Sequence, residues 1–160
     1  RRIAFIAGRP DLRSAGLREA GYRQALTEAG IPIDPALIRV GLFQRETTRG
    51  PASELLSHPQ RPTAVFAAND LSAFAVIKVA SELGLDVPGD LSVIGFDDIP
   101  ESSQMSPALS TIRQPMQKLG AVAAGMLSAL MNGEELSQTH IRLPTRLISR
   151  MTTAPPAASR

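Results

Sequence analysis

The chain has 160 residues, 43% hydrophobic and 20% charged, a composition typical of a soluble globular domain with its own core. It contains no cysteine, which excludes disulfides and thiolate metal sites. The sequence pI is about 9.7, but the net charge is only +2 and the arginines are scattered, so the chain lacks the dense basic stripe of a DNA-binding surface. No apolar run is long enough to span a bilayer.

Apolar runs alternate with segments of helical periodicity through most of the chain. Near-continuous runs, typical of strands buried on both faces of a parallel sheet, occur at Ile3–Ala7, Leu37–Phe43, Ala64–Ala68 and Leu91–Phe96. The first run follows two arginines but is too short for a signal peptide, so we interpret it as a strand and expect a cytoplasmic protein. Helices are predicted over residues 14–29, 46–57 and 70–83, and Gly84 is a suitable stop for the last of these. This alternation predicts an α/β fold with a mostly parallel sheet.

After Phe96 the regular alternation of strands and helices ends. Residues 97–109 contain two prolines and three serines and are predicted to form a loop. A short extended segment, Ser110–Gln114, leads to a strongly amphipathic helix over residues 116–131 that Asn132 and Gly133 close. Its apolar stripe comprises Met116, Leu119, Val122, Ala123, Met126, Leu127 and Leu130. Ile141–Ile148 is a candidate last strand, and the tail from Thr152 to Arg160 is expected to be frayed.

Ligands of open α/β sheets bind beyond the carboxyl ends of the strands. The predicted strand ends carry Gly8, Phe43, Asn69, Asp70, Asp97 and Asp98. Carboxylates accept hydroxyl hydrogen bonds and an amide both donates and accepts, so this set suits a ligand rich in hydroxyl groups.

Each of these residues also has a purely structural interpretation. Asp70 directly precedes a helix, so an N-cap role would explain it, and Asn69 could be a turn residue. Asp97 and Asp98 are neighbours on an extended chain, so their side chains point in opposite directions and at most one faces a shared site. Phe43 could belong to the core.

Arg18 falls within the apolar stripe of its helix, between Ala15 and Tyr22. A charge on a buried helix face is costly unless it is paired. Arg18 lies in the first turns of the helix, near the carboxyl ends of the strands. We therefore expect it either to pair with an internal carboxylate or to face a ligand.

The sequence lacks the motifs of common α/β enzymes. It has no dinucleotide-binding glycine fingerprint, no P-loop and no nucleophile elbow. The two histidines, His58 and His140, are far apart and have no third metal ligand nearby. We therefore expect neither catalysis nor a cofactor.

Six segments reproduce, in order and spacing, the pattern of the effector-binding domain of the LacI/GalR family of transcription repressors. They are RRIAFIAG (1–8), GYRQALTEAG (21–30), PTAVFAAND (62–70), VPGDLSVIGFDD (87–98), PALSTIRQP (107–115) and LPTRLISR (143–150). The combination of the fourth and fifth segments is highly specific. The family's DNA-binding head and most of its N-terminal subdomain have no counterpart in this sequence.

The resemblance implies a periplasmic-binding-protein-like (type I) fold, truncated here, in which two Rossmann-like subdomains enclose an effector cleft. Residues 1–113 and 145–153 look like the C-terminal subdomain, and residues 115–144 like a piece of the N-terminal one. Residues 154–160 would be a flexible tail.

The resemblance also implies roles for particular residues. Asn69 and Asp97 match positions that hydrogen-bond the effector, Phe43 matches an aromatic wall, and Gln114 lies at the hinge side of the cleft. Many sugar-responsive members carry an arginine at the position of Gly16, and the nearest candidate here is Arg18.

The leading hypothesis is therefore the ligand-sensing part of a repressor. It would bind a small effector, expected to be a carbohydrate, and form a homodimer. It would control operator DNA through the absent head, without contact with a membrane. The alternatives are a periplasmic sugar-binding protein of a transport system and, less favoured, an α/β enzyme.

Overall fold

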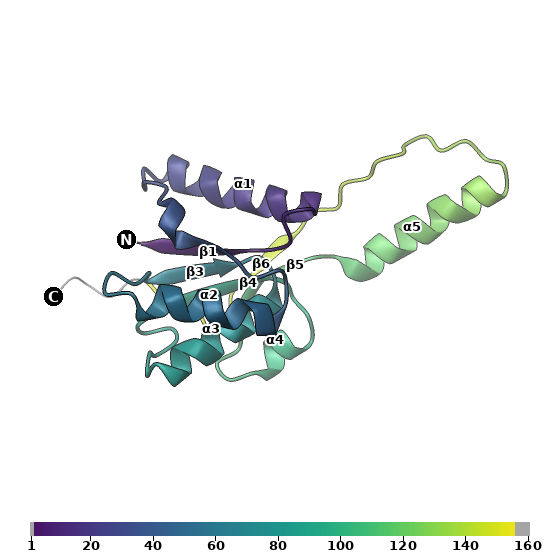
Figure 1. The fold of residues 1–160 in the computed structure, drawn as a ribbon. Helices are drawn as coiled ribbons and strands as arrows, with labels where there is room; N and C mark the ends of the chain where they lie inside the picture. Colours follow the sequence, from purple (N-terminus) through teal and green to yellow (C-terminus); the bar gives the residue numbers. More distant parts are fainter. Residues whose placement is uncertain (1, 156–160) are drawn as a thin grey trace.

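A computed structural model of the chain describes residues 2–155, and within them six strands form one sheet in the order β2-β1-β3-β4-β5-β6 (Figure 1). The strands are β1 (Ile3–Ala7), β2 (Ile38–Val40), β3 (Ala64–Ala67), β4 (Ser92–Asp97), β5 (Ser110–Arg113) and β6 (Arg146–Ile148). Neighbouring strands run parallel except β5 and β6, which are antiparallel. The expected α/β fold with a mostly parallel sheet is confirmed.

Helices cover both faces of the sheet, as right-handed crossovers on either side of β1 require. The helices are α1 (Arg13–Glu28), α2 (Arg45–Ser57), α3 (Asp70–Glu82), α4 (Glu101–Gln104) and α5 (Met116–Met131), with a 3-10 turn at Pro35–Leu37. Figure 1 shows α1 on one face, and α2 and α3 packed side by side on the other. The larger core cluster lies under α2 and α3. The smaller one lies under α1, where the rings of Phe5 and Tyr22 stack.

Three predicted elements differ from the structure. The strand expected at Leu37–Phe43 is confined to Ile38–Val40, because Leu42 and Phe43 have φ values of 57° and 65°, which no strand accommodates. The loop expected over 97–109 contains the short helix α4. The last strand covers only Arg146–Ile148 of the expected Ile141–Ile148, since the preceding residues have no strand to pair with in the described structure.

Asp70 has a structural role different from the expected N-cap. The cap of α3 is Asn69, whose side-chain oxygen accepts from the Ser72 amide at 3.0 Å. Asp70 is completely buried and bonds to three donors on the segments around β5. They are the Ile99 amide at 3.0 Å, the Ser102 hydroxyl at 2.7 Å and the Thr111 hydroxyl at 2.5 Å. Asp70 therefore ties α3 to the α4 segment and to β5.

The start of the expected tail is ordered. Thr152 is fully buried: its hydroxyl donates to the Val93 carbonyl and accepts from the Ser110 amide. The Ala154 amide donates to the Ser92 hydroxyl at 3.1 Å, so order extends one residue into the segment expected to be flexible from 154. Fraying from Thr152 is therefore wrong, and residues 156–160 lie outside the described residues.

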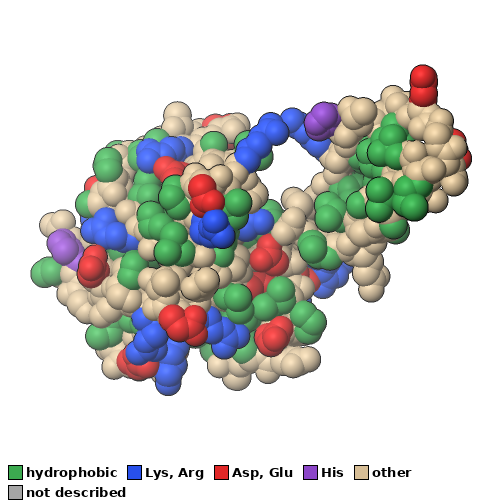
Figure 2. All heavy atoms as spheres, turned by 45° about the vertical axis from the view of Figure 1, so that its right-hand side comes forward, with side chains coloured by type: hydrophobic (Ala, Val, Ile, Leu, Met, Phe, Trp, Pro, Cys, Tyr) green, Lys and Arg blue, Asp and Glu red, His purple; other side chains and the backbone are tan. Residues whose placement is uncertain are grey.

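Helix α5 projects away from the sheet on two connections (Figure 1). None of its residues is buried, although its sequence is amphipathic. Figure 2 shows hydrophobic side chains gathered along this lobe and an opening between the returning chain and the body. The large exposed side chains of α5 are Met116, Leu119, Leu127, Leu130 and Met131. The apolar stripe is therefore present without anything in the described chain to cover it.

Candidate functional site

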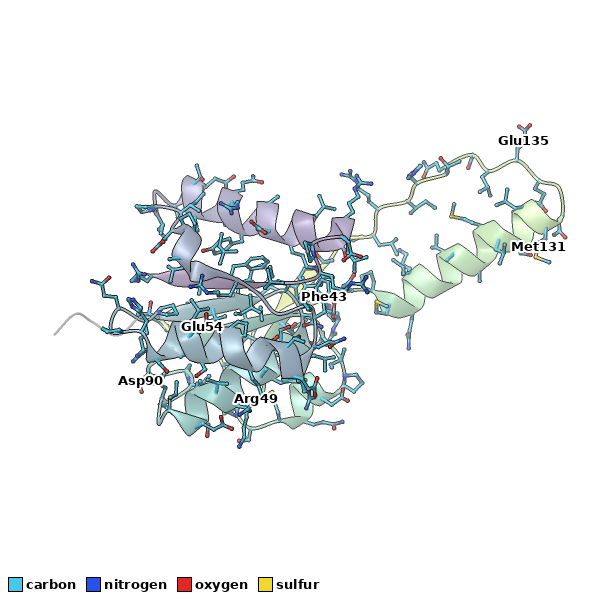
Figure 3. The ribbon with its side chains drawn as sticks, viewed as in Figure 1. Phe43, Arg49, Glu54, Asp90, Met131 and Glu135 are labelled. Carbon is cyan, nitrogen blue, oxygen red and sulfur yellow. The ribbon has the colours of Figure 1, made fainter. Side chains whose placement is uncertain are left out.

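Five residues singled out from the sequence meet at the carboxyl ends of the strands. Phe43 follows β2, Asn69 follows β3, Asp97 ends β4, Gln114 follows β5, and Arg18 reaches over from the second turn of α1. Figure 3 labels Phe43 at this edge, on the side of the body from which α5 departs. Every one of the five contacts at least one of the others, and these contacts define the site.

Arg18 is the central cation of the site, with 14% of its side chain exposed. Its guanidinium donates to the Ala68 carbonyl at 2.5 Å and lies 3.5 Å from the Asp97 carboxylate. The guanidinium carbon lies 3.9 Å from the centre of the Phe96 ring and 5.4 Å from that of Phe43. Of the two roles expected for Arg18, pairing with an internal carboxylate is present in the structure.

Asp97 accepts from two of the other site residues. Besides Arg18, the Gln114 side-chain amide donates to it at 2.6 Å. Burial raises the pKa of Asp97 even though Arg18 and Gln114 favour its charged form. Burial likewise lowers the pKa of Arg18 against the attraction of Asp97. Burial thus disfavours the charged form of both groups, a pattern that is common at functional sites.

Asn69 and Phe43 hold each other in place. The Asn69 amide donates to the Phe43 carbonyl at 3.0 Å while its oxygen caps α3. Phe43 has φ +65°, which turns its ring back over Gly8. A β-carbon on Gly8 would overlap that ring, so glycine is the residue that lets the two approach.

In the described structure, Asp98 hydrogen-bonds to other partners than Asp97 does, although residues 97 and 98 are not the extended chain expected, since their φ values are 123° and 61°. Only 4% of its side chain is exposed. It forms ion pairs with Arg113 and with Arg150, the latter at 2.6 Å. These pairs were not foreseen, because neither arginine is near Asp98 in sequence.

Phe96 was also missed, because it reads as a core residue at the end of an apolar strand. It lines an open apolar groove of about 620 Å³ between α1 and the sheet. The groove is lined mainly by Ile3, Leu17, Tyr22, Leu26, Phe66, Ile94 and Ile112, with Arg18 and Gln114 at its polar end. The sequence signal would have been the alternation of Ile94 and Phe96 on one face of β4.

Residues 2–155 contain no group of three acidic, histidine or cysteine side chains placed to hold a metal ion. Among the same residues, no helix combines the length and the apolar character needed to cross a bilayer. Hydrogen-bond donors and acceptors and an aromatic ring at the strand ends of a parallel sheet are typical of the class of small-molecule binding modules.

Comparison with known proteins gives the same class. A family profile described as "Periplasmic binding protein-like domain" matches residues 1–153. The repressor PurR of Erwinia tasmaniensis is 41% identical over 155 residues, which are 96% of this chain and 45% of PurR. Catabolite control protein A of Priestia megaterium is 36% identical over 94% of this chain and 46% of that protein. The chain therefore spans less than half the length of these curated relatives.

Solved structures agree. The complex of the transcriptional regulator CelR with cellobiose superposes with a TM-score of 0.90 at 34% identity, over 95% of this chain and 46% of that one. The lac repressor dimer bound to operator and the anti-inducer ONPF gives 0.86 at 34% identity, over 96% and 53%. The chain belongs to the periplasmic binding protein-like family and, within it, to the effector-binding domains of LacI/GalR regulators.

Proposed function

We propose that this chain senses a small-molecule effector for a transcription repressor, and that the effector binds at Arg18, Phe43, Asn69, Asp97 and Gln114. The observation that carries the proposal is the convergence of Arg18, Asp97 and Gln114 beside the Phe43 ring at the carboxyl ends of the strands. A ligand can hydrogen-bond to all three polar groups at that place. No covalent step is needed, because the ligand acts by favouring one arrangement of the protein over another.

The leading candidate for the effector is a sugar. Asp97 accepts, Arg18 donates, and the amides of Asn69 and Gln114 do both, which matches a ring carrying several hydroxyls. The similarity to a regulator solved with cellobiose supports this class. A planar heterocycle such as a purine base is the second candidate, because the Phe43 ring beside Arg18 offers a stacking surface.

We further propose the arrangement of the complete protein. Residues 1–113 and 145–153 form the C-terminal subdomain, whereas 115–144, whose helix buries no side chain, belong to the N-terminal one. Operator binding is assigned to a part of the protein outside these 160 residues, in the cytoplasm, and the regulator acts as a homodimer. The lac repressor dimer on its operator supports this assembly. Since the relatives are repressors, we do not propose a transport role.

The test is calorimetry on the full-length protein with cellobiose, a panel of mono- and disaccharides, and purine bases. Asp97→Ala and Asn69→Ala should each weaken binding of the ligand found by about 1–3 kcal/mol, or roughly tenfold or more. Asp11→Ala is the matched control, because Asp11 is an exposed carboxylate that bonds only to Arg9 in the described structure. Unchanged affinity in both site variants would place the site elsewhere.

A further inference from the structure

The consecutive carboxylates Asp97 and Asp98 bind two consecutive residues at the end of β5: the residue that follows the strand and the last residue in it. Asp97 accepts from Gln114, and Asp98 pairs with Arg113. The two side chains diverge because the backbone turns sharply here, with φ values of 123° at Asp97 and 61° at Asp98. The end of β5 is therefore bonded to two carboxylates, to Asp97 in the candidate site and to the buried Asp98.

Asp98 also reaches the chain that returns from α5. Arg150 follows β6 and donates to Asp98 at 2.6 Å, while its other guanidinium nitrogen donates to the Leu109 carbonyl at 2.8 Å. β5 leads out to α5 and β6 leads back, with Arg113 opposite Arg146 in the antiparallel pair. One carboxylate thus bonds to the last residue of β5 and to a residue just beyond β6, the two strands that carry the lobe.

The electrostatics of Asp98 differ from those of Asp97. Burial alone would raise the pKa of Asp98, but the hydrogen bonds and charges of Arg113 and Arg150 outweigh it and hold that pKa below its usual value. Asp98 therefore stays ionised and paired. A ligand can therefore replace the hydrogen bond between Asp97 and Gln114, whereas the ion pairs of Asp98 with Arg113 and Arg150 stay formed.

We propose that Asp98 is a positioning residue that transmits effector occupancy at Asp97 to β5 and β6, the two strands that carry the α5 lobe. This inference rests on the proposed function. Arg18 and Gln114 both donate to the same Asp97 oxygen, Oδ1. An effector hydroxyl that donates to Oδ1 therefore competes with the side-chain amide of Gln114, the residue that directly precedes Pro115 and α5. Once the Gln114 side chain is released, the ion pairs of Asp98 with Arg113 and Arg150 remain, and the lobe turns about them. Without Asp98, the effector still binds, but the α5 lobe does not turn in response.

The experiment measures two quantities on the full-length protein and on its Asp98→Asn variant. Calorimetry gives the Kd of the effector identified above, and fluorescence anisotropy gives operator affinity with and without that effector. We expect the effector Kd to stay within about threefold and the effector-dependent change in operator affinity to shrink roughly tenfold or more. Asp90→Asn is the control, because Asp90 is a surface carboxylate beside Arg61.

A second pair of variants protects the test against misfolding. Arg113 is 40% exposed at a strand end, so Arg113→Met should fold while removing one of the two pairs. Arg113→Met should reduce the effector-dependent change in operator affinity. Arg113→Lys keeps a positive charge beside Asp98 and should retain much of that change, a difference that a loss of stability alone would not produce. Full coupling in Asp98→Asn or in Arg113→Met would overturn the inference. Loss of effector binding in a folded Asp98→Asn would also overturn it, by making Asp98 a ligand contact. If Asp97→Ala binds normally, the proposed function has failed instead.

Discussion

The ring of Phe43 lies directly over Gly8, in the space that any larger residue at position 8 would occupy. Gly8→Ala should therefore displace the ring from the site while leaving the sheet intact. We expect the effector affinity to fall by between about twofold and tenfold, in line with the loss of about 0.5–1.5 kcal/mol from one aromatic contact. Calorimetry on the full-length protein measures it.

Gly50→Ala is the matched control, because nothing lies within 4 Å of a β-carbon there and Gly50 is inside α2. That variant should gain about 0.5–1 kcal/mol of stability from the helix preference of alanine, with unchanged affinity. Equal affinities in the two variants would mean that the Phe43 ring does not contact the effector.

Asp70 should matter for stability rather than for binding. Asp70→Ala leaves the Ile99 amide and the hydroxyls of Ser102 and Thr111 without their acceptor in a dry interior. The free energy of unfolding should drop by about 3 kcal/mol. Urea unfolding measures it, with the exposed Asp11→Ala expected to change stability by less than about 0.5 kcal/mol. If the free energy of unfolding falls no more than it does in the control, the hydrogen bonds of Asp70 make no net contribution to stability.

The two neighbouring carboxylates should have opposite effects on stability as the pH changes. The pKa of Asp97 is raised in the folded state, so folded protein holds that proton to higher pH, and this contribution to stability falls as pH rises through the window above the usual pKa. The pKa of Asp98 is lowered, so its contribution is present above the usual pKa and is lost as pH falls through the folded value.

At neutral pH, Asp97→Asn should therefore raise the melting temperature, and Asp98→Asn should lower it. At pH values below both folded pKa values the differences from wild type should shrink, because the wild-type carboxyls are then protonated as well. Thermal melts across the acidic range check this. Shifts of the same sign in both variants at neutral pH would contradict the assignment of the two environments.

The alternation of buried strands and amphipathic helices was enough to predict the sheet, because it depends on residue spacing alone. The strand-end rule likewise selected Phe43, Asn69 and Asp97 before any contact was known. Local spacing could not decide between Asn69 and Asp70 as the cap of α3. That outcome depends on Asp70 being claimed by donors on the α4 segment and on β5, which are distant in sequence.

Two further features were beyond local analysis for the same reason. The alanine- and proline-rich composition after Thr152 predicts fraying, yet Thr152 pairs with groups on β4 and β5 that the sequence does not place beside it. The turn at Leu42 and Phe43 requires positive φ at two residues without glycine, which no propensity favours. Strain of this kind is tolerated where surrounding contacts enforce it, here the bond from Asn69.

The last prediction concerns α5. The side chains of Leu127 and Leu130 are 58% and 56% exposed, and an apolar stripe of this length normally marks an association surface. The 160-residue chain should therefore self-associate in a concentration-dependent way, as light scattering can measure. Leu127→Gln with Leu130→Gln should weaken that association while leaving the melting temperature of the body within about 4 °C, because neither side chain packs on the sheet.

Excision gives the sharper form of the same test. The antiparallel register pairs Arg113 with Arg146, which places Gln114 opposite Thr145, the spacing that a two-residue hairpin turn closes. Replacing residues 115–144 with Asn-Gly should thus give a folded monomer that keeps the circular dichroism and cooperative melting of the body. Loss of folding would show that the α5 lobe stabilises the sheet, through contacts that the described structure does not contain. Persistent self-association of the folded, excised protein would show that the associating surface lies on the body instead.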